Sequence, residues 1–233
     1  MVLVRRGRFR RRANGVESTV DNTMAYVAIP DMEERFAHPA GGDECTLVEF
    51  SPALWRTLTG DAALVTRSSV YVDAALDLAH RRLLGAREDV DYALCEELLG
   101  LLGTALGQVV ATVPSQVERR SSDHKLAAAA REAIAMDHPA AAGLFPLAES
   151  LAVSPYRLSR VFSREFGVSL TRYRNRVRIG RALDSLEQGQ IGLAQLAADL
   201  GFADQAHMTR MVREQLGHTP SALERILSGS VHV

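Results

Sequence analysis

The residues LAESLAVSPYRLSRVFSREFG, from Leu147 to Gly167, are echoed by LAADLGFADQAHMTRMVREQLG, from Leu196 to Gly217, with one extra residue in the turn of the second copy. Each copy predicts a short amphipathic helix, a tight turn and a second helix, and Ser154 and Asp204 are the expected N-caps of the second helices. Both copies end on a glycine, which predicts a left-handed cap. The repeat therefore indicates two helix-turn-helix units.

Apolar residues recur at helical spacing on both helices of each unit, which predicts that the two helices pack face to face. The inner positions are Leu147, Ala148, Leu151, Leu158, Val161, Phe162 and Phe166 in the first copy, and Leu196, Ala197, Leu200, Met208, Met211, Val212 and Leu216 in the second. The opposite face of each second helix is polar and suits contacts with phosphates and base edges. This face holds Tyr156, Arg157, Ser159, Arg160, Ser163 and Arg164 in the first copy, and Gln205, Ala206, His207, Thr209, Arg210 and Arg213 in the second.

Between the copies, the residues from Thr171 to Gln190 predict one linker helix of about five turns, or about 27 Å. Successive major grooves on one face of B-DNA recur about every 34 Å, so such a rod could hold two recognition helices in adjacent grooves. Its first half is rich in arginine. A charge run is ordinarily a solvated helix face, but its place between two helix-turn-helix units favours phosphate binding. The predicted phosphate-binding residues are Arg157, Arg164, Arg172, Arg174, Arg176, His207 and Arg213.

The stretch from about Lys125 to Leu227 resembles the DNA-binding domain of the AraC/XylS family of bacterial transcription regulators. The motifs that carry the resemblance are Gly201-Phe202 at the turn, Asp204-Gln205, His207, Arg210 and the ending Gly217-x-Thr219-Pro220. The resemblance implies base-reading positions at Tyr156, Ser159, Arg160, Gln205, Ala206, Thr209 and Arg210.

The second copy departs from the family pattern at three positions. Ala206 stands where a polar reader is common, and Met208 and Val212 replace aromatic packing residues. These changes predict that the second recognition helix reads bases weakly, or relies on contact with the thymine methyl group.

The first 52 residues have the pattern of strands and turns. The candidate strands are VLVRRGRFRRR followed by Asn14-Gly15, then TMAYVAIP, then HPAGGDECTLVEF with Gly41-Gly42 in its turn. In front of this DNA-binding domain, they resemble the cupin-like jelly-roll half of the family's sensor domains. About fifty residues is short for a full barrel, so either the chain starts inside the domain or the sheet is small and open.

After Ser51-Pro52 the helical period returns, and we expect two helices at Val70–Leu84 and Asp89–Val113. A stripe along the second helix holds Leu94, Leu98, Leu101 and Leu102. This stripe could pack on the protein's own sheet and first helix, or form a dimer seam. The polar residues PSQVERRSSD that follow predict a linker.

The predicted fold is therefore α+β. A short, cupin-like β part (1–52) and a helical pair for dimerisation (53–113) precede a linker (114–124) and an all-α domain with two helix-turn-helix units joined by a long helix (125–233).

Composition limits the class of protein. The 233 residues carry a net charge of −1, so DNA affinity must come from a local basic patch rather than from the whole chain. Two cysteines are too few for a disulfide framework and indicate a reducing, cytoplasmic environment. The basic N-terminus lacks the apolar region of a signal peptide, and the apolar run from Leu98 to Val113 is short for a membrane span.

Two chemistries are weighed against this interpretation. His38, Asp43, Glu44 and Cys45 are close in sequence, but a cupin metal site needs several ligands and this region has one histidine. Cys45 and Cys95 could form a redox switch, although no neighbouring group predicts a reactive thiol. We therefore expect no metal, no cofactor and no enzymatic activity.

The sequence predicts a sequence-specific regulator of transcription that binds double-stranded DNA as a homodimer. RNA polymerase is a further candidate partner, an effector is unidentified, and activation and repression both stay open. The alternative is a cupin-like small-molecule-binding or metal-dependent protein whose helical domain binds a protein partner. Such a helix should present apolar anchors, whereas the first recognition helix presents Arg157, Ser159, Arg160 and Arg164. A low-specificity architectural binder is disfavoured by the pairing of Gln205 with Arg160 and Arg210.

Overall fold

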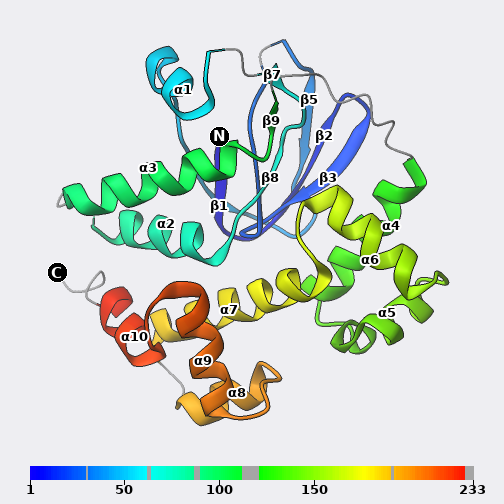
Figure 1. Ribbon diagram of the computed structural model, residues 1–233, viewed down its shortest axis with the longest axis vertical. Coiled ribbons are helices and arrows are strands. Elements are labelled where there is room, and N and C mark those ends of the chain that lie inside the picture. Colours follow the sequence, from blue (N-terminus) through cyan, green and yellow to red (C-terminus); the bar gives the residue numbers. More distant parts are fainter. Residues whose placement is uncertain (30, 62–63, 87–89, 112–120, 190–191, 229–233) are drawn as a thin grey trace. The chain divides into compact units, whose positions relative to one another are not determined.

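The computed structural model describes residues 1–29, 31–61, 64–86, 90–111, 121–189 and 192–228 (Figure 1). The chain forms two compact units, and each is built from two separate stretches of sequence. Unit 1 comprises Met1–Tyr71 and Leu106–Val177, and unit 2 comprises Val72–Ala105 and Arg178–Val233. Strands are confined to unit 1 among the described residues, and helices occur in both units, so the α+β class is confirmed.

The β part of unit 1 consists of short antiparallel strands. They are β1 (Val2–Arg6), β2 (Phe9–Ala13), β3 (Val16–Val20), β4 (Met24–Tyr26), β5 (Glu34–Ala37), β6 (Glu44–Leu47), β7 (Leu64–Val65), β8 (Ser69–Tyr71) and β9 (Val110–Ala111). One sheet has the order β6-β1-β4-β8, a second has the order β3-β2-β5, and β7 pairs with β9. Val4 and Tyr26 of the first sheet pack against Phe9 and Val20 of the second, so the two larger sheets enclose a small apolar core.

The β2–β3 hairpin forms as the sequence predicts. Asn14 and Gly15 both have positive φ, 49° and 75°, as a type I′ turn requires. The register pairs Ala13 with Val16. Along β2 buried and exposed residues alternate, and the buried Arg11 donates from Nη2 to Glu34 Oε1 at 2.6 Å.

Two boundaries of the predicted helices are wrong. Val70 and Tyr71 belong to strand β8, and Val110 belongs to β9 rather than to the end of a helix. Gln108 explains the change, because its side-chain amide exchanges two 3.0 Å hydrogen bonds with the backbone of Tyr71. Strands β7 to β9 thus extend the β part beyond residue 52. Val113 lies outside the described residues.

The helices of unit 1 follow the sheet in sequence. They are α1 (Pro52–Thr59), α4 (Ser121–Ala135), the 3-10 turn η1 (Pro139–Ala142), α5 (Leu144–Ser150), α6 (Pro155–Phe166) and the start of α7 (Leu170–Gln188). Their shared core includes Ala127, Leu147, Leu158, Phe162 and Tyr173. Most of the predicted linker lies outside the described residues, and residues 121–124 form the first turn of α4.

A buried polar network ties the turn between β3 and β4 to α4 and α7 within unit 1. Arg131 pairs with Asp21 at 2.5 Å and donates from Nε to the hydroxyl of Tyr173 at 3.0 Å. The same hydroxyl lies 2.8 Å from the hydroxyl of Thr23. Burial alone would raise the pKa of Asp21, but Arg131 and Thr23 outweigh it and hold that pKa below its usual value. The β part is therefore joined to α4 and to the start of α7 by polar contacts as well as by apolar packing.

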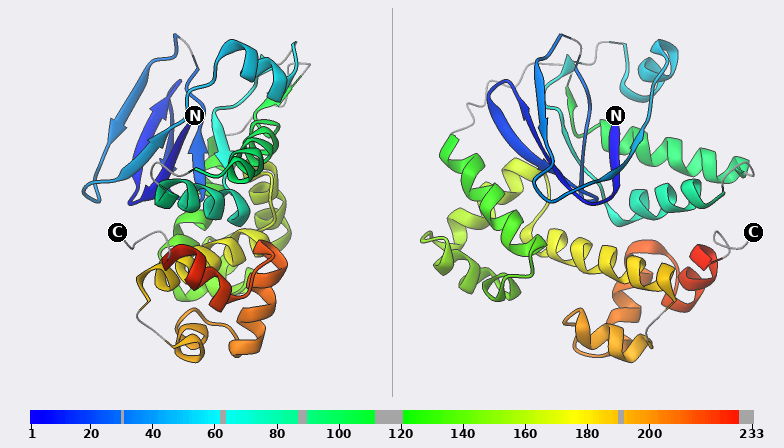
Figure 2. Two further views of the ribbon diagram at one scale, coloured as in Figure 1. Left: turned by 90° about the vertical axis from the view of Figure 1, so that its left-hand side faces the viewer. Right: turned by 180° about the vertical axis from the view of Figure 1, so that it is seen from behind.

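Unit 2 contains α2 (Ala74–Ala86), α3 (Tyr92–Leu106), the rest of α7, α8 (Leu193–Asp199), α9 (Gln205–Leu216) and α10 (Pro220–Ser228). The last residue of α3, Leu106, belongs to unit 1. Helix α2 does not form a separate pair with α3 alone. Ala74 and Leu78 share one core with Ile179 and Leu183 of α7 and with residues of α8, α9 and α10. In Figure 2, α9 and α10 lie beside the carboxyl-terminal half of α7. Helix α2 is thus part of the core of the second helix-turn-helix.

Arg81 of α2 anchors this core electrostatically. Its side chain is fully buried, and Nε donates to Asp77 Oδ1 at 2.9 Å. Nη1 lies 2.8 Å from Asp184 Oδ1 and 3.2 Å from Glu187 Oε2, both on α7. Burial would lower the pKa of Arg81, but the carboxylates of Asp77 and Asp184 raise it, so the guanidinium stays charged. Among the described residues, no helix is long and apolar enough to cross a membrane.

Candidate nucleic-acid interface

The first helix-turn-helix consists of α5 and α6. Ser154 caps α6 by accepting a hydrogen bond at Oγ from the backbone N–H of Arg157 at 3.2 Å, and Pro155 occupies the first turn. Gly167 ends the helix with φ 74° and ψ 3°, and its N–H donates to the carbonyl of Ser163. The predicted caps of α6 are confirmed.

The second helix-turn-helix, α8 and α9, repeats this local geometry. Asp204 accepts at Oδ1 from the N–H of His207 at 2.6 Å, and Gly217 ends α9 with φ 71°. The turn between α8 and α9 is one residue longer than the turn between α5 and α6, as the sequence alignment of the copies predicts. Both recognition helices are therefore fixed at their two ends by short-range contacts.

The two turns contain the same left-handed backbone conformation at corresponding positions, but with different residues. Gly201 has φ 69° in the second turn, and Ala152 has φ 53° at the corresponding place in the first. A left-handed conformation costs a residue with a Cβ about 1–2 kcal/mol. A Cβ on Gly201 would lie 3.6 Å from Arg178 Nη2, which is an ordinary contact, so the backbone conformation decides its cost.

We expect Gly201→Ala to lower the free energy of unfolding by about 1 kcal/mol. The matched control is Gly100→Ala in the interior of α3, where a Cβ meets open space. Since alanine is the better helix former, this change should stabilise the protein by about 0.5–1 kcal/mol. Urea denaturation followed by far-ultraviolet circular dichroism measures both, and two changes of the same sign would contradict the interpretation.

The predicted base-reading residues lie on α6 and α9 as expected. Tyr156, Arg160, Gln205, Ala206 and Arg210 are exposed, and Tyr156, a large aromatic residue, is 74% exposed. Ser159 and Thr209 are half-buried. Each helix thus buries its apolar face in its own unit and leaves the polar face accessible, which is the arrangement that reading a groove requires.

The predicted phosphate-binding residues fall into three groups. Arg172 and Arg213 are exposed, and Arg174 is half-buried. Arg157 and Arg164 are partly exposed and both pair with Asp123 of α4, at 3.3 Å and 2.5 Å. Asp123 lies in the predicted linker, and no contact with α6 was expected of it.

Arg176 and His207 have structural partners. Arg176 is fully buried, and its Nη2 donates to the carbonyl of Asn22 at 2.7 Å. The prediction that Arg176 contacts phosphate is therefore wrong. The alternating arginines of α7 point to different sides of the helix, and Arg176 points inward. His207 accepts at Nδ1 from the N–H of Ala203 at 3.3 Å, and its ring meets Phe202 edge to face. His207 thus also fixes the turn before α9.

The leucine stripe of α3 is only partly accessible. Leu94 and Leu102 are buried within the single chain, and Leu98 and Leu101 are half-buried. Tyr92 and Leu99, on other faces of the helix, are exposed. The predicted seam through Leu94, Leu98, Leu101 and Leu102 remains a prediction.

The acidic cluster near β6 makes local contacts. His38 Nδ1 lies 2.5 Å from Asp43 Oδ1, and the thiol of Cys45 donates to Asp43 Oδ2 at 2.9 Å. Desolvation and the neighbouring Asp43 raise the pKa of Cys45 to about 12, so this thiol remains protonated near neutral pH. Among the described residues, no group of three or more histidine, cysteine, aspartate or glutamate side chains is placed to hold a metal ion.

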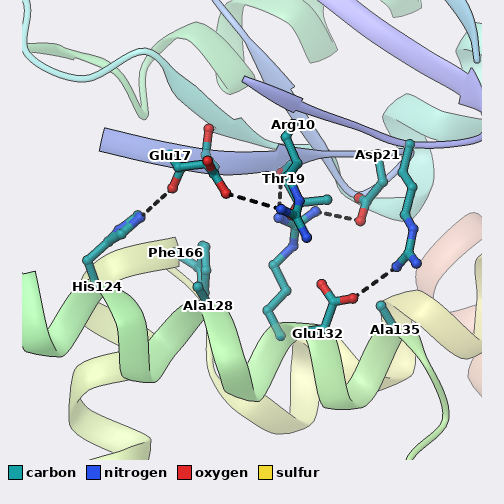
Figure 3. Close-up of a pocket in the computed structure, with 12 residues that line it drawn as sticks. Arg10, Glu17, Thr19, Asp21, His124, Ala128, Glu132, Ala135 and Phe166 are labelled. Carbon is teal, nitrogen blue, oxygen red and sulfur yellow. Dashed lines mark hydrogen bonds and ion pairs between the residues drawn. The ribbon is translucent and has the colours of Figure 1, made fainter. Parts of the chain in front are cut away.

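A cavity of about 200 Å³ lies between the β2–β3 hairpin and α4 within unit 1 (Figure 3). Two ion pairs are formed by residues that line this cavity. Arg8 Nη1 lies 3.1 Å from Glu132 Oε1, and Arg10 Nη1 lies 3.7 Å from Glu17 Oε1. His124 donates from Nε2 to the carbonyl of Glu17 at 3.1 Å. The cavity thus has polar walls of both charges and is bounded by the sheet and by a helix that packs on α6.

Known proteins similar to this chain include matches to its C-terminal part. Residues 147–226 match the model of a family described as a helix-turn-helix domain. Over 75 residues the chain is 31% identical to the arabinose operon regulatory protein of Salmonella typhimurium, a match that covers 32% of this chain and 27% of that regulator.

Two solved structures are similar at lower identity. The C-terminal domain of AraT, a response regulator from Geobacillus stearothermophilus, is 24% identical over 48% of this chain and 88% of that chain, with a TM-score of 0.41. ToxT from Vibrio cholerae is 12% identical over 98% of this chain and 88% of that chain, with a TM-score of 0.39. Residues 147–226 of this chain thus match a helix-turn-helix domain, and the motifs of its two repeats resemble those of AraC/XylS regulators.

Proposed function

We propose that this protein is a transcription regulator that binds double-stranded DNA sequence-specifically through both of its helix-turn-helix units. The observation that carries the proposal is the matched pair α6 and α9. Each is capped at both ends, buries an apolar face and exposes a polar one. The proposed base readers are Tyr156, Ser159, Arg160, Gln205, Ala206, Thr209 and Arg210, and the proposed phosphate contacts are Arg157, Arg164, Arg172, Arg174 and Arg213.

We propose that the cavity beside α4 and the leucine stripe of α3 serve regulation. We assign an effector response to the cavity beside α4, because a molecule bound there would touch both the sheet and the first helix-turn-helix. We propose homodimerisation through the α3 stripe, action in the cytoplasm with RNA polymerase as a partner, and no catalytic activity. We assign DNA binding to residues 125–233.

One protomer should protect two patches of DNA about 10 base pairs apart on one face of the duplex. The reason is that α7 is a single helix of 19 residues, about 28 Å long. A site is first obtained by selection from random duplexes with the purified protein, and hydroxyl-radical footprinting then maps the protection.

The matched control for the footprint is the double variant Gln205→Ala and Arg210→Ala, which alters only the polar face of α9. It should lose one patch and retain the other. A single short patch per protomer in the unaltered protein would contradict the proposal, as would selection that enriches no sequence.

A further inference from the structure

Asp123 lies in the first turn of α4 and reaches across to the polar face of α6. Its Oδ2 accepts from Arg164 Nη2 at 2.5 Å, and its Oδ1 accepts from Arg157 Nη2 at 3.3 Å. The two arginines are seven residues apart, which places them on the same side of the helix two turns from each other. One carboxylate therefore bridges two guanidinium groups of the candidate recognition helix.

The bridge is charged at neutral pH. The hydrogen bond from Arg164, opposed by desolvation and reinforced by Arg157, lowers the pKa of Asp123. Glu165 adds a second acid, since its Oε1 lies 3.7 Å from Arg164 Nε and its Oε2 lies 3.6 Å from His124 Nδ1. Two arginines that would otherwise present two positive charges are thus partly neutralised from within the protein.

The same arginines remain open to solvent. The side chains of Arg157 and Arg164 are 53% and 40% exposed, whereas that of Asp123 is 10% exposed. A phosphate approaching α6 can therefore reach the arginines, whose Nη2 atoms already donate to Asp123. Carboxylate and phosphate oxygens accept charge-assisted hydrogen bonds from guanidinium in the same geometry, so they compete for it.

We propose that Asp123 is an intramolecular competitor for DNA phosphate, which lowers the sequence-independent affinity of α6 and so raises the share of binding that depends on base contacts. The inference rests on the proposed function. Non-specific affinity comes almost entirely from phosphate contacts, whereas base contacts supply the discrimination. A residue that weakens the phosphate contacts and spares the base contacts therefore leaves base contacts a larger share of the binding free energy.

The test is Asp123→Asn, which removes the charge, retains one acceptor oxygen of the same reach and replaces the other oxygen with an amide NH2 group. On a random-sequence duplex we expect binding about eightfold tighter at 0.1 M salt and about fourfold tighter at 0.2 M, because one further phosphate contact steepens the salt slope by about 0.9. On the selected site we expect the same gain, because a phosphate contact is independent of sequence. The control is Glu149→Gln on the exposed surface of α5, which makes the same change in net charge and should leave both affinities nearly unaltered.

A second pair of variants separates competition from mere positioning. In a background of Arg157→Gln and Arg164→Gln, Asp123→Asn should give no gain, because the donors for which it competes are absent. If Asp123 only positions the arginines, Asp123→Asn in the otherwise unaltered protein will weaken binding or leave it unchanged, and either result overturns the inference.

Folding and function are checked separately. Circular dichroism reports whether Asp123→Asn folds, and Asp123→Ser, another uncharged residue suited to a first helical turn, replaces it if it does not. If the unaltered protein binds no duplex, both the proposed function and this inference are wrong. If the unaltered protein binds DNA and the uncharged variant binds no more tightly, only the inference is wrong.

Discussion

Arg81→Ala is expected to lower the free energy of unfolding of unit 2 by about 3–5 kcal/mol. The change removes the guanidinium that pairs with the buried carboxylate of Asp77, whose side chain is 2% exposed. It also removes the contacts from α2 to Asp184 and Glu187 of α7. Breaking a buried salt-bridge network is among the few kinds of single change that destabilise a protein by this much.

The matched control is the next residue in the chain. Arg82 pairs with Glu97 at 2.6 Å, but both side chains are partly exposed, so Arg82→Ala should cost about 1 kcal/mol or less. Urea denaturation followed by far-ultraviolet circular dichroism measures the loss of helix in both variants. Equal, small effects would show that water reaches Asp77 and that the ion pair is not a part of the core.

Arg160→Ala should weaken binding to the selected site by about 1–3 kcal/mol and relax the preference at one base pair. Arg160 is exposed near the middle of α6, on the face that the capped ends of the helix hold in place. Binding to a panel of duplexes with single base-pair changes measures the effect, because the loss should vanish for the sequences that already lack the preferred base.

The control for this prediction is Arg172→Ala, an exposed position in the first turn of α7. It should weaken binding to every duplex alike and reduce the salt slope by about 1. Arg176 is unsuitable as a control, because it is buried and its loss would test folding. If Arg160→Ala behaves as Arg172→Ala does, then Arg160 contacts phosphate and does not read a base.

The features that sequence could predict are those that depend on neighbours in the chain. The caps at Ser154 and Asp204, the left-handed glycines at 167 and 217 and the Asn14-Gly15 hairpin are all decided within about four residues. The repeat also placed α6 and α9 correctly, because their apolar positions recur with the helical period.

The features that the sequence could not predict depend on partners far along the chain. Strand β9 and the end of α3 lie in one apolar run, Leu98–Val113, in which period alone does not separate a buried helix from a strand. The burial of Arg176 requires the carbonyl of Asn22, and the role of Asp123 requires α6 to lie against α4. Helix α2 was assigned to a pair with α3, because nothing local indicates that Ala74 and Leu78 belong with Ile179.

The order of the elements in unit 2 has a consequence for synthesis on the ribosome. Leu78 of α2 packs against residues from Ile179 onward, so about 100 residues are translated before its partners exist. At about 5–20 residues per second, this interval lasts about 5 to 20 s. During that time the apolar side of α2 and the charged Arg81 lack their native cover. Translation, rather than the finished unit, is therefore the stage at which α2 is open to wrong partners and to chaperones.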